Sequence, residues 1–145
     1  MTTAGQLDYT ALLAFRTALR RFQRWSEAQA EVAGLTPAQH QLLLAIKGHG
    51  DERGPTIGEV ADYLLLRHHS AVELVNRAQA AGLVTRTKDD KDGRVVRLRL
   101  TEDAQQRLAR LTQLHIDELR QLEPLLRHLV DADGEREDGA LPLEP

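Results

Sequence analysis

The sequence contains no cysteine, which excludes a disulfide scaffold, a thiolate zinc site and a thiol redox switch within these 145 residues. It also has no apolar run near the ~20 residues that a membrane-spanning helix needs. The first ten residues, MTTAGQLDYT, lack the charged-then-apolar order of a signal peptide. We therefore expect a cytoplasmic protein with no membrane partner.

Aromatic side chains are also scarce, at 3% of the chain, and three of the five lie between Phe15 and Trp25. Bulky apolar surface is thus concentrated near the N-terminus. Hydrophobic residues still make up 41% of the chain, which is enough to form a core.

Charge is distributed unevenly along the chain. The formal net charge is −3, but the last fifteen residues have a net charge of −5, so the other 130 have +2. Between Arg67 and Arg99 there are eight Lys/Arg against four Asp/Glu. This local basic field matters more for phosphate contact than the overall sum. The acidic end, residues 132–145, is predicted to be a disordered tail.

Helical periodicity dominates the first half of the chain. Apolar residues recur in steps of three and four from Leu7 to about Ala30, and Gly34 ends this helix. Thr36-Pro37-Ala38-Gln39 predicts an N-cap, a first-turn proline and a capping box, opening a helix that stops at Gly48 or Gly50.

Two shorter helices are predicted next. Thr56 and Glu59 form a second capping box, and a further helix runs from about His68 to Ala81, with Gly82 as its left-handed cap. Two compact helices joined by a few residues are typical of a helix-turn-helix.

The pattern changes to period two in residues 94–101, where leucine and valine alternate with arginine, as in a half-buried strand. Residues 83–87 are the predicted partner strand, and the charged segment KDDKDG is the turn. A β-hairpin directly after a helix-turn-helix is a wing. Thr101 caps a last long helix, which Pro124 is expected to break or kink.

These elements predict a mainly α fold with a small β-hairpin wing. Residues 1–131 form a single domain, in which the winged helix-turn-helix (about 36–100) is flanked by helices at about 7–33 and 101–131. The flanking helices have more apolar surface than a small winged domain can cover. They could pack on each other within one chain, but we favour their packing against a second copy in a two-fold homodimer.

The blocks GLTPAQ…LLLAI, TIGEVADYL, RHHSAVELVNRAQAAGLVTR and DKDGRVVRLRLTEDA resemble the MarR family of bacterial regulators. The strongest part is the wing, where Asp92-x-Arg94 is followed by Leu98-x-Leu100-Thr101. The resemblance covers about Leu7 to Leu129. It departs from the family at His68-His69, where many relatives have small polar residues or proline, and in its short C-terminal helical region.

The resemblance implies that the chain is a transcriptional regulator, a repressor released by a small-molecule effector. The helix from His68 would enter the major groove of double-stranded DNA, at a roughly palindromic operator. Asn76 could pair with adenine, Val72 could touch a thymine methyl group, and Glu73 could accept from cytosine. The full set of predicted DNA contacts is Arg67, His68, His69, Ser70, Val72, Glu73, Asn76, Arg77, Lys91 and Arg94.

Within this set, Arg67 and Arg77 are predicted to contact phosphates, and Arg94 to reach into the minor groove from the wing tip. Asp92 would hold the shape of the wing through an ion pair or a turn hydrogen bond. Five further basic residues are each a weak signal, and about half of them are expected to be merely solvated; they are Arg86, Lys88, Lys91, Arg97 and Arg99.

By the same resemblance, Phe22, Trp25 and His40 could line a cleft for a small aromatic or anionic effector, although Phe22 and Trp25 could equally be dimer core. Adjacent histidines point about 100° apart on a helix, so His68 and His69 do not predict a metal site. No cofactor and no catalytic residue is predicted, because the sequence has no activated nucleophile pair and no phosphate-binding glycine loop. The alternative function is a winged-helix module that binds protein rather than DNA.

Overall fold

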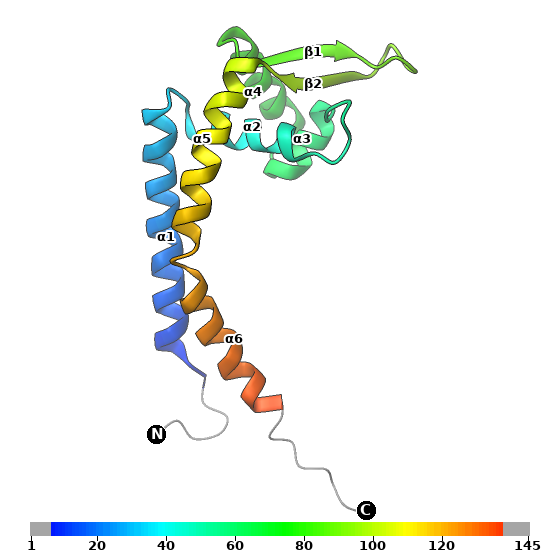
Figure 1. Ribbon diagram of the computed structural model, residues 1–145. Coiled ribbons are helices and arrows are strands. Elements are labelled where there is room, and N and C mark those ends of the chain that lie inside the picture. Colours follow the sequence, from blue (N-terminus) through cyan, green and yellow to red (C-terminus); the bar gives the residue numbers. More distant parts are fainter. Residues whose placement is uncertain (1–6, 138–145) are drawn as a thin grey trace, which may run out of the picture. The chain divides into compact units, whose positions relative to one another are not determined.

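The computed structural model describes residues 7–137, with side chains up to residue 131, and divides the chain into two compact units. One, the winged unit, comprises residues 27–113, and the other, the helical unit, comprises residues 1–26 and 114–145. Two long helices, α1 (Tyr9–Val32) and α5 (Glu102–Leu119), pass from one unit into the other. Figure 1 shows the elements, whose order confirms the predicted mainly α fold with a hairpin wing.

After the end of α1, the winged unit contains three shorter helices, α2 (Pro37–Gly48), α3 (Ile57–Leu64) and α4 (His68–Ala80). Both predicted capping boxes are present: the hydroxyl of Thr36 accepts from the backbone of Gln39, and that of Thr56 from the backbone of Glu59. Each fixes the start of its helix by satisfying N–H groups that have no partner within the helix. Gly82 has a φ of +75°, as expected of the left-handed cap after α4.

The wing is an antiparallel pair of strands, β1 (Val84–Lys88) and β2 (Val96–Leu100), with Val84 opposite Leu100 and Lys88 opposite Val96. Figure 1 shows its free end projecting beyond the helices of this unit. At its base the strands enter the core, because Val84 and Leu98 are buried. The predicted strands, residues 83–87 and 94–101, differ from those observed by one or two residues at each end.

A single apolar cluster holds the winged unit together. Its members come from the ends of α1 and α5 as well as from α2, α3, α4 and the base of the wing. They are Ala30, Leu35, Leu42, Leu43, Ile46, Val60, Val75, Ala78, Leu83, Val84, Leu98, Ala104, Leu108 and Leu111. The helix-turn-helix and the wing therefore share one core.

The helical unit contains the first part of α1, the end of α5 and α6 (Glu123–Glu137). As predicted, the C-terminal helix is broken near Pro124, which lies in the first turn of α6, where its missing N–H costs least. α6 continues to Glu137, six residues into the predicted tail, and residues 138–145 lie outside the described residues. Over residues 7–137, no helix combines the length and hydropathy that crossing a membrane would require.

Gly54 lies where the loop between α2 and α3 meets the wing. The adjacent Pro55 carbonyl accepts a hydrogen bond from the Leu98 N–H at 2.9 Å. Gly54 has a φ of +90°, and a Cβ built on it would lie 2.0 Å from the Leu98 carbonyl oxygen. A residue with a side chain cannot occupy this position without moving β2.

We therefore predict that Gly54→Ala lowers the free energy of unfolding by more than about 2 kcal/mol, because it combines a left-handed backbone with overpacking. Gly50→Ala is the matched control, since a Cβ there meets nothing within 4 Å. Urea denaturation of both variants measures the difference. Equal free energies of unfolding for the two variants would show that Gly54 and the Leu98 carbonyl are not in close contact.

Candidate nucleic-acid interface

The two faces of α4 differ sharply in burial. Ala71, Val75 and Ala78 are buried, as predicted for the inward stripe. The opposite face is largely exposed, and it contains the predicted DNA contacts of this helix. His69, Glu73, Asn76 and Arg77 are exposed, as are Arg67 and His68 at the N-terminus, whereas Ser70 and Val72 are half-buried. The structure thus brings the predicted recognition residues to one accessible surface.

Asn76 has a partner in the wing. The guanidinium of Arg86, on β1, donates a hydrogen bond to Asn76 Oδ1. Pairing with adenine would use both the oxygen and the nitrogen of the amide, so Oδ1 would have to accept a second bond or exchange its partner. This contact joins the wing to the outward face of α4, and Arg86 was only a weak signal in the sequence.

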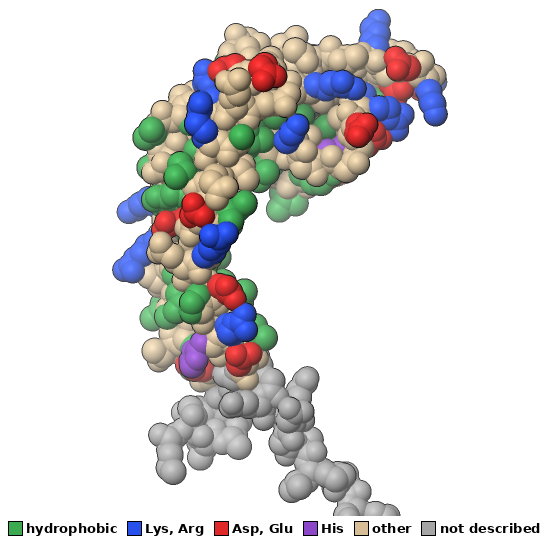
Figure 2. All heavy atoms as spheres, viewed as in Figure 1, with side chains coloured by type: hydrophobic (Ala, Val, Ile, Leu, Met, Phe, Trp, Pro, Cys, Tyr) green, Lys and Arg blue, Asp and Glu red, His purple; other side chains and the backbone are tan. Residues whose placement is uncertain are grey.

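The wing tip is organised by Asp92. Its Oδ1 accepts from the backbone N–H of Arg94 at 3.0 Å and from Arg94 Nε at 3.2 Å. These are the turn hydrogen bond and the ion pair expected of this aspartate. The side chain of Arg94 is still 93% exposed. Figure 2 shows Lys and Arg side chains gathered around the free end of the wing, with acidic ones among them.

Arg97 differs from the other wing arginines because it is committed to contacts within the protein. Its Nε and Nη2 donate to Asp89 Oδ2 at 3.1 and 3.0 Å, and its Nη1 donates to the Gly54 carbonyl at 3.2 Å. The side chains of Arg97 and Asp89 are only 15% and 5% exposed. Arg97 is therefore a structural residue of the wing and not a free basic group.

The loop before α3 adds a second arginine to this cluster. Arg53 Nη1 lies 3.6 Å from Asp89 Oδ2, and Arg53 Nη2 lies 2.7 Å from Asp51 Oδ2. Hydrogen bonds from the Lys91 backbone N–H and from Arg97 hold the pKa of Asp89 below its usual value. The Arg53 side chain likewise lowers the pKa of Asp51. Both carboxylates are therefore ionised at neutral pH.

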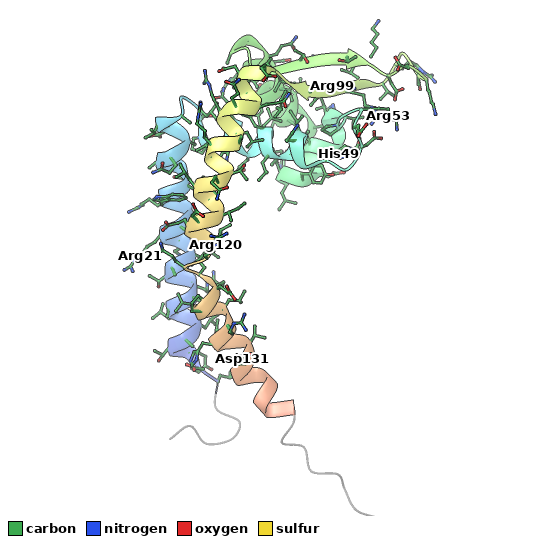
Figure 3. The ribbon with its side chains drawn as sticks, viewed as in Figure 1. Arg21, His49, Arg53, Arg99, Arg120 and Asp131 are labelled. Carbon is green, nitrogen blue, oxygen red and sulfur yellow. The ribbon has the colours of Figure 1, made fainter. Side chains whose placement is uncertain are left out.

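Glu59 connects the same cluster to α2 and α3. One of its oxygens closes the capping box on the Thr56 N–H at 3.1 Å and lies 3.8 Å from Arg97 Nη1. The other lies 3.3 Å from His49 Nε2, and His49 Nδ1 is 2.8 Å from the Tyr63 hydroxyl. Figure 3 labels His49 and Arg53, which lie below the hairpin in this view.

Sequence reasoning missed this cluster because it interpreted KDDKDG only as a charged turn. The missed residues are His49, Asp51, Arg53, Glu59 as an ion-pair partner, Tyr63 and Asp89. The useful signal is the hairpin register: Arg97 is opposite Thr87, so Asp89 is its diagonal neighbour on the same face. That register depends on where the strands end, which the sequence did not define closely enough.

The predicted effector residues lie in both units. In the helical unit, the half-buried rings of Phe22 and Trp25 pack on His115, with centroids 5.8 and 4.9 Å from it, and Ser26 Oγ is 2.6 Å from His115 Nε2. His40 is a buried residue of α2 in the winged unit. The described residues contain no group of His, Asp and Glu side chains that could hold a metal ion.

Comparison with known proteins agrees with this architecture. A sequence model of the MarR family matches residues 33–95. The transcriptional repressor MdtR of Bacillus subtilis is 28% identical over 103 residues, which are 71% of this chain and 64% of the length of that protein.

Solved structures share the fold across nearly the whole chain. The Staphylococcus aureus MepR–DNA complex superposes with a TM-score of 0.68 at 18% identity, covering 94% of this chain and 100% of that one. AbsC of Streptomyces coelicolor, a MarR family regulator, gives 0.65 at 20% identity, covering 92% and 98%. Residues 33–95, which include the helix-turn-helix and the first strand of the wing, are thus similar in sequence to the MarR family, and the fold is that of its solved members.

Proposed function

We propose that this protein is a transcriptional regulator that binds specific sites in double-stranded DNA as a homodimer. One observation carries the proposal: a highly exposed arginine, Arg94, is held at the wing tip on the same unit as the exposed polar face of α4. A recognition helix and an arginine-tipped wing can contact the major groove and the adjacent minor groove together.

Each predicted contact has a role in this arrangement. The N-terminal residues of α4, from His68 to Val72, would lie nearest the bases, and Glu73 and Asn76 would follow along the groove. Arg67, Arg77 and Lys91 would contact phosphates and set the position of the protein without reading sequence. The relatives support this proposal, since MdtR is named a transcriptional repressor and the MepR structure is a complex with DNA.

The homodimer is proposed from the helical unit. Many large apolar side chains there are exposed in the single chain, and these are Leu7, Tyr9, Leu12, Leu13, Leu114, Ile116, Leu119, Leu126 and Val130. Soluble proteins seldom leave so many apolar side chains uncovered on one small unit. A second copy would cover them, and its two-fold symmetry would place two winged units on a roughly palindromic site.

An effector remains part of the proposal. The effector would be a small aromatic or anionic molecule, and the candidate contacts are Phe22 and Trp25 in the helical unit and, separately, His40 in the winged unit. The half-buried contacts of both rings with His115 also suit a packing role in the dimer core. A protein-interaction module is the other candidate function, and the exposed Arg94 favours DNA.

The DNA contact of the wing predicts a specific salt effect. Arg94→Ala should weaken binding to a duplex and reduce the slope of log K against log salt by about one phosphate contact. Arg110→Ala is the matched control, because Arg110 is an exposed arginine of α5 in the same unit. Fluorescence anisotropy at several salt concentrations measures both. An unchanged slope for Arg94→Ala would remove Arg94 from the interface.

The dimer predicts a second effect. Leu13→Glu places a charge on the exposed apolar surface of the helical unit, so it should shift the protein toward monomer in sedimentation velocity at micromolar concentration. Val32→Glu is the control, since Val32 is equally apolar and 83% exposed on the same helix but belongs to the winged unit. If Leu13→Glu leaves the monomer–dimer equilibrium unchanged, the dimer interface does not include this surface.

A further inference from the structure

We propose that Asp89 and Arg97 are positioning residues for DNA binding, which fix the wing on the helix-turn-helix so that Arg94 is presented together with α4. The inference rests on the proposed function, and it assigns both residues a role without contact to DNA. It starts from a geometric fact: this pair is the most buried ion pair described in the wing.

The two oxygens of Asp89 perform different tasks. Oδ1 accepts from the backbone N–H of Lys91 at 2.9 Å, which shapes the first turn of the wing loop. Oδ2 accepts both contacts from Arg97 and lies 3.6 Å from Arg53. One side chain therefore shapes the wing loop and also fastens it to the strand and to the α2–α3 loop.

Arg97 completes the attachment because it contacts three different elements. Besides Asp89 in the wing loop, it donates to the Gly54 carbonyl before α3 and lies 3.8 Å from Glu59 on α3. Its neighbour Leu98 points the other way and is fully buried in the apolar core. β2 is thus held on one face by the burial of Leu98 and on the other by the Arg97 contacts. Of these two attachments, the Arg97–Asp89 ion pair is the one that reaches the wing loop.

An isolated two-stranded hairpin is marginally stable in water. Without the Arg97–Asp89 ion pair, the tip residues from Asp89 to Val95 would sample many conformations, and ordering them on DNA would cost affinity. With the ion pair formed, the tip is already ordered in the folded protein, so DNA binding does not lose this conformational entropy. Asp89 and Arg97 should therefore strengthen DNA binding although neither touches it.

Simple electrostatics predicts the opposite change in DNA affinity when the charge of Asp89 is removed. Asp89 is an acid within a basic surface, so removing its charge would favour DNA if charge alone mattered. Asp89→Asn keeps an oxygen for the Lys91 turn but loses the charge that holds Arg97. Asp90→Asn is the matched control, because it removes the same charge one residue along the chain. The Asp90 side chain is exposed and acts on Arg53 through charge alone, without a hydrogen bond or close ion pair among the described residues.

The experiment uses the full chain and the tightest-binding duplex recovered from a random-sequence pool. We expect Asp89→Asn to bind roughly five- to ten-fold more weakly, with the salt slope of the wild type, and Asp90→Asn to bind equally or more tightly. Hydrogen exchange without DNA should show faster exchange at residues 88–96 in Asp89→Asn alone, while α2, α3 and α4 remain protected. Asp89→Asn binding as tightly as Asp90→Asn would overturn the proposal.

Arg97→Lys is the second variant, in case Asp89→Asn disturbs the fold. A lysine keeps the charge, and thus any phosphate contact, but it cannot span Asp89 and Gly54 together. We expect the same weakening with an unchanged salt slope, and wild-type affinity would contradict the positioning role. Different results would refute the proposed function and the role of the Asp89–Arg97 pair. A wild-type protein that binds no duplex would refute the proposed function, whereas unchanged exchange at residues 88–96 would refute only the role of the pair.

Discussion

The attachment of β2 is the constraint on which the proposed DNA-binding surface depends. Leu98 is buried in the common core, and its N–H donates to the Pro55 carbonyl. The Leu98 carbonyl lies so close to Gly54 that a side chain at position 54 would not fit. One residue earlier, Arg97 binds Asp89 and the Gly54 carbonyl. Arg97 and Leu98 together therefore attach the wing to the α2–α3 loop and to the helices of the common core.

Function follows from what this framework leaves exposed. The buried stripe of α4 fixes its rotation, so that His69, Glu73 and Asn76 face outward. Arg86 then reaches from β1 to Asn76, and Asp92 holds the backbone of Arg94 at the tip. Buried charges pair within the protein, while the remaining basic groups stay accessible to an anionic polymer. A protein with net negative charge can therefore present a local basic surface, as the proposed DNA binding requires.

Much of this architecture was predictable from local signals. Thr36 and Thr56 mark the helix starts because their capping boxes need only nearby residues, and Gly82 marks a stop for a similar reason. The outward face of α4 followed from helical periodicity. The cluster around Asp89 and Arg97 did not, because it joins them to His49 and Arg53 in the α2–α3 loop and to Glu59 on α3. Spacing cannot predict such pairs until the strand register is known.

Site-specific DNA binding by a dimer is tested most directly by selecting bound fragments from genomic DNA with the full chain, at low and at physiological salt. Such binding should enrich an inverted repeat with half-sites about one helical turn apart, and its affinity should fall steeply with salt. A folded protein that enriches no sequence at either salt concentration would contradict it, and would favour a winged helix that binds protein.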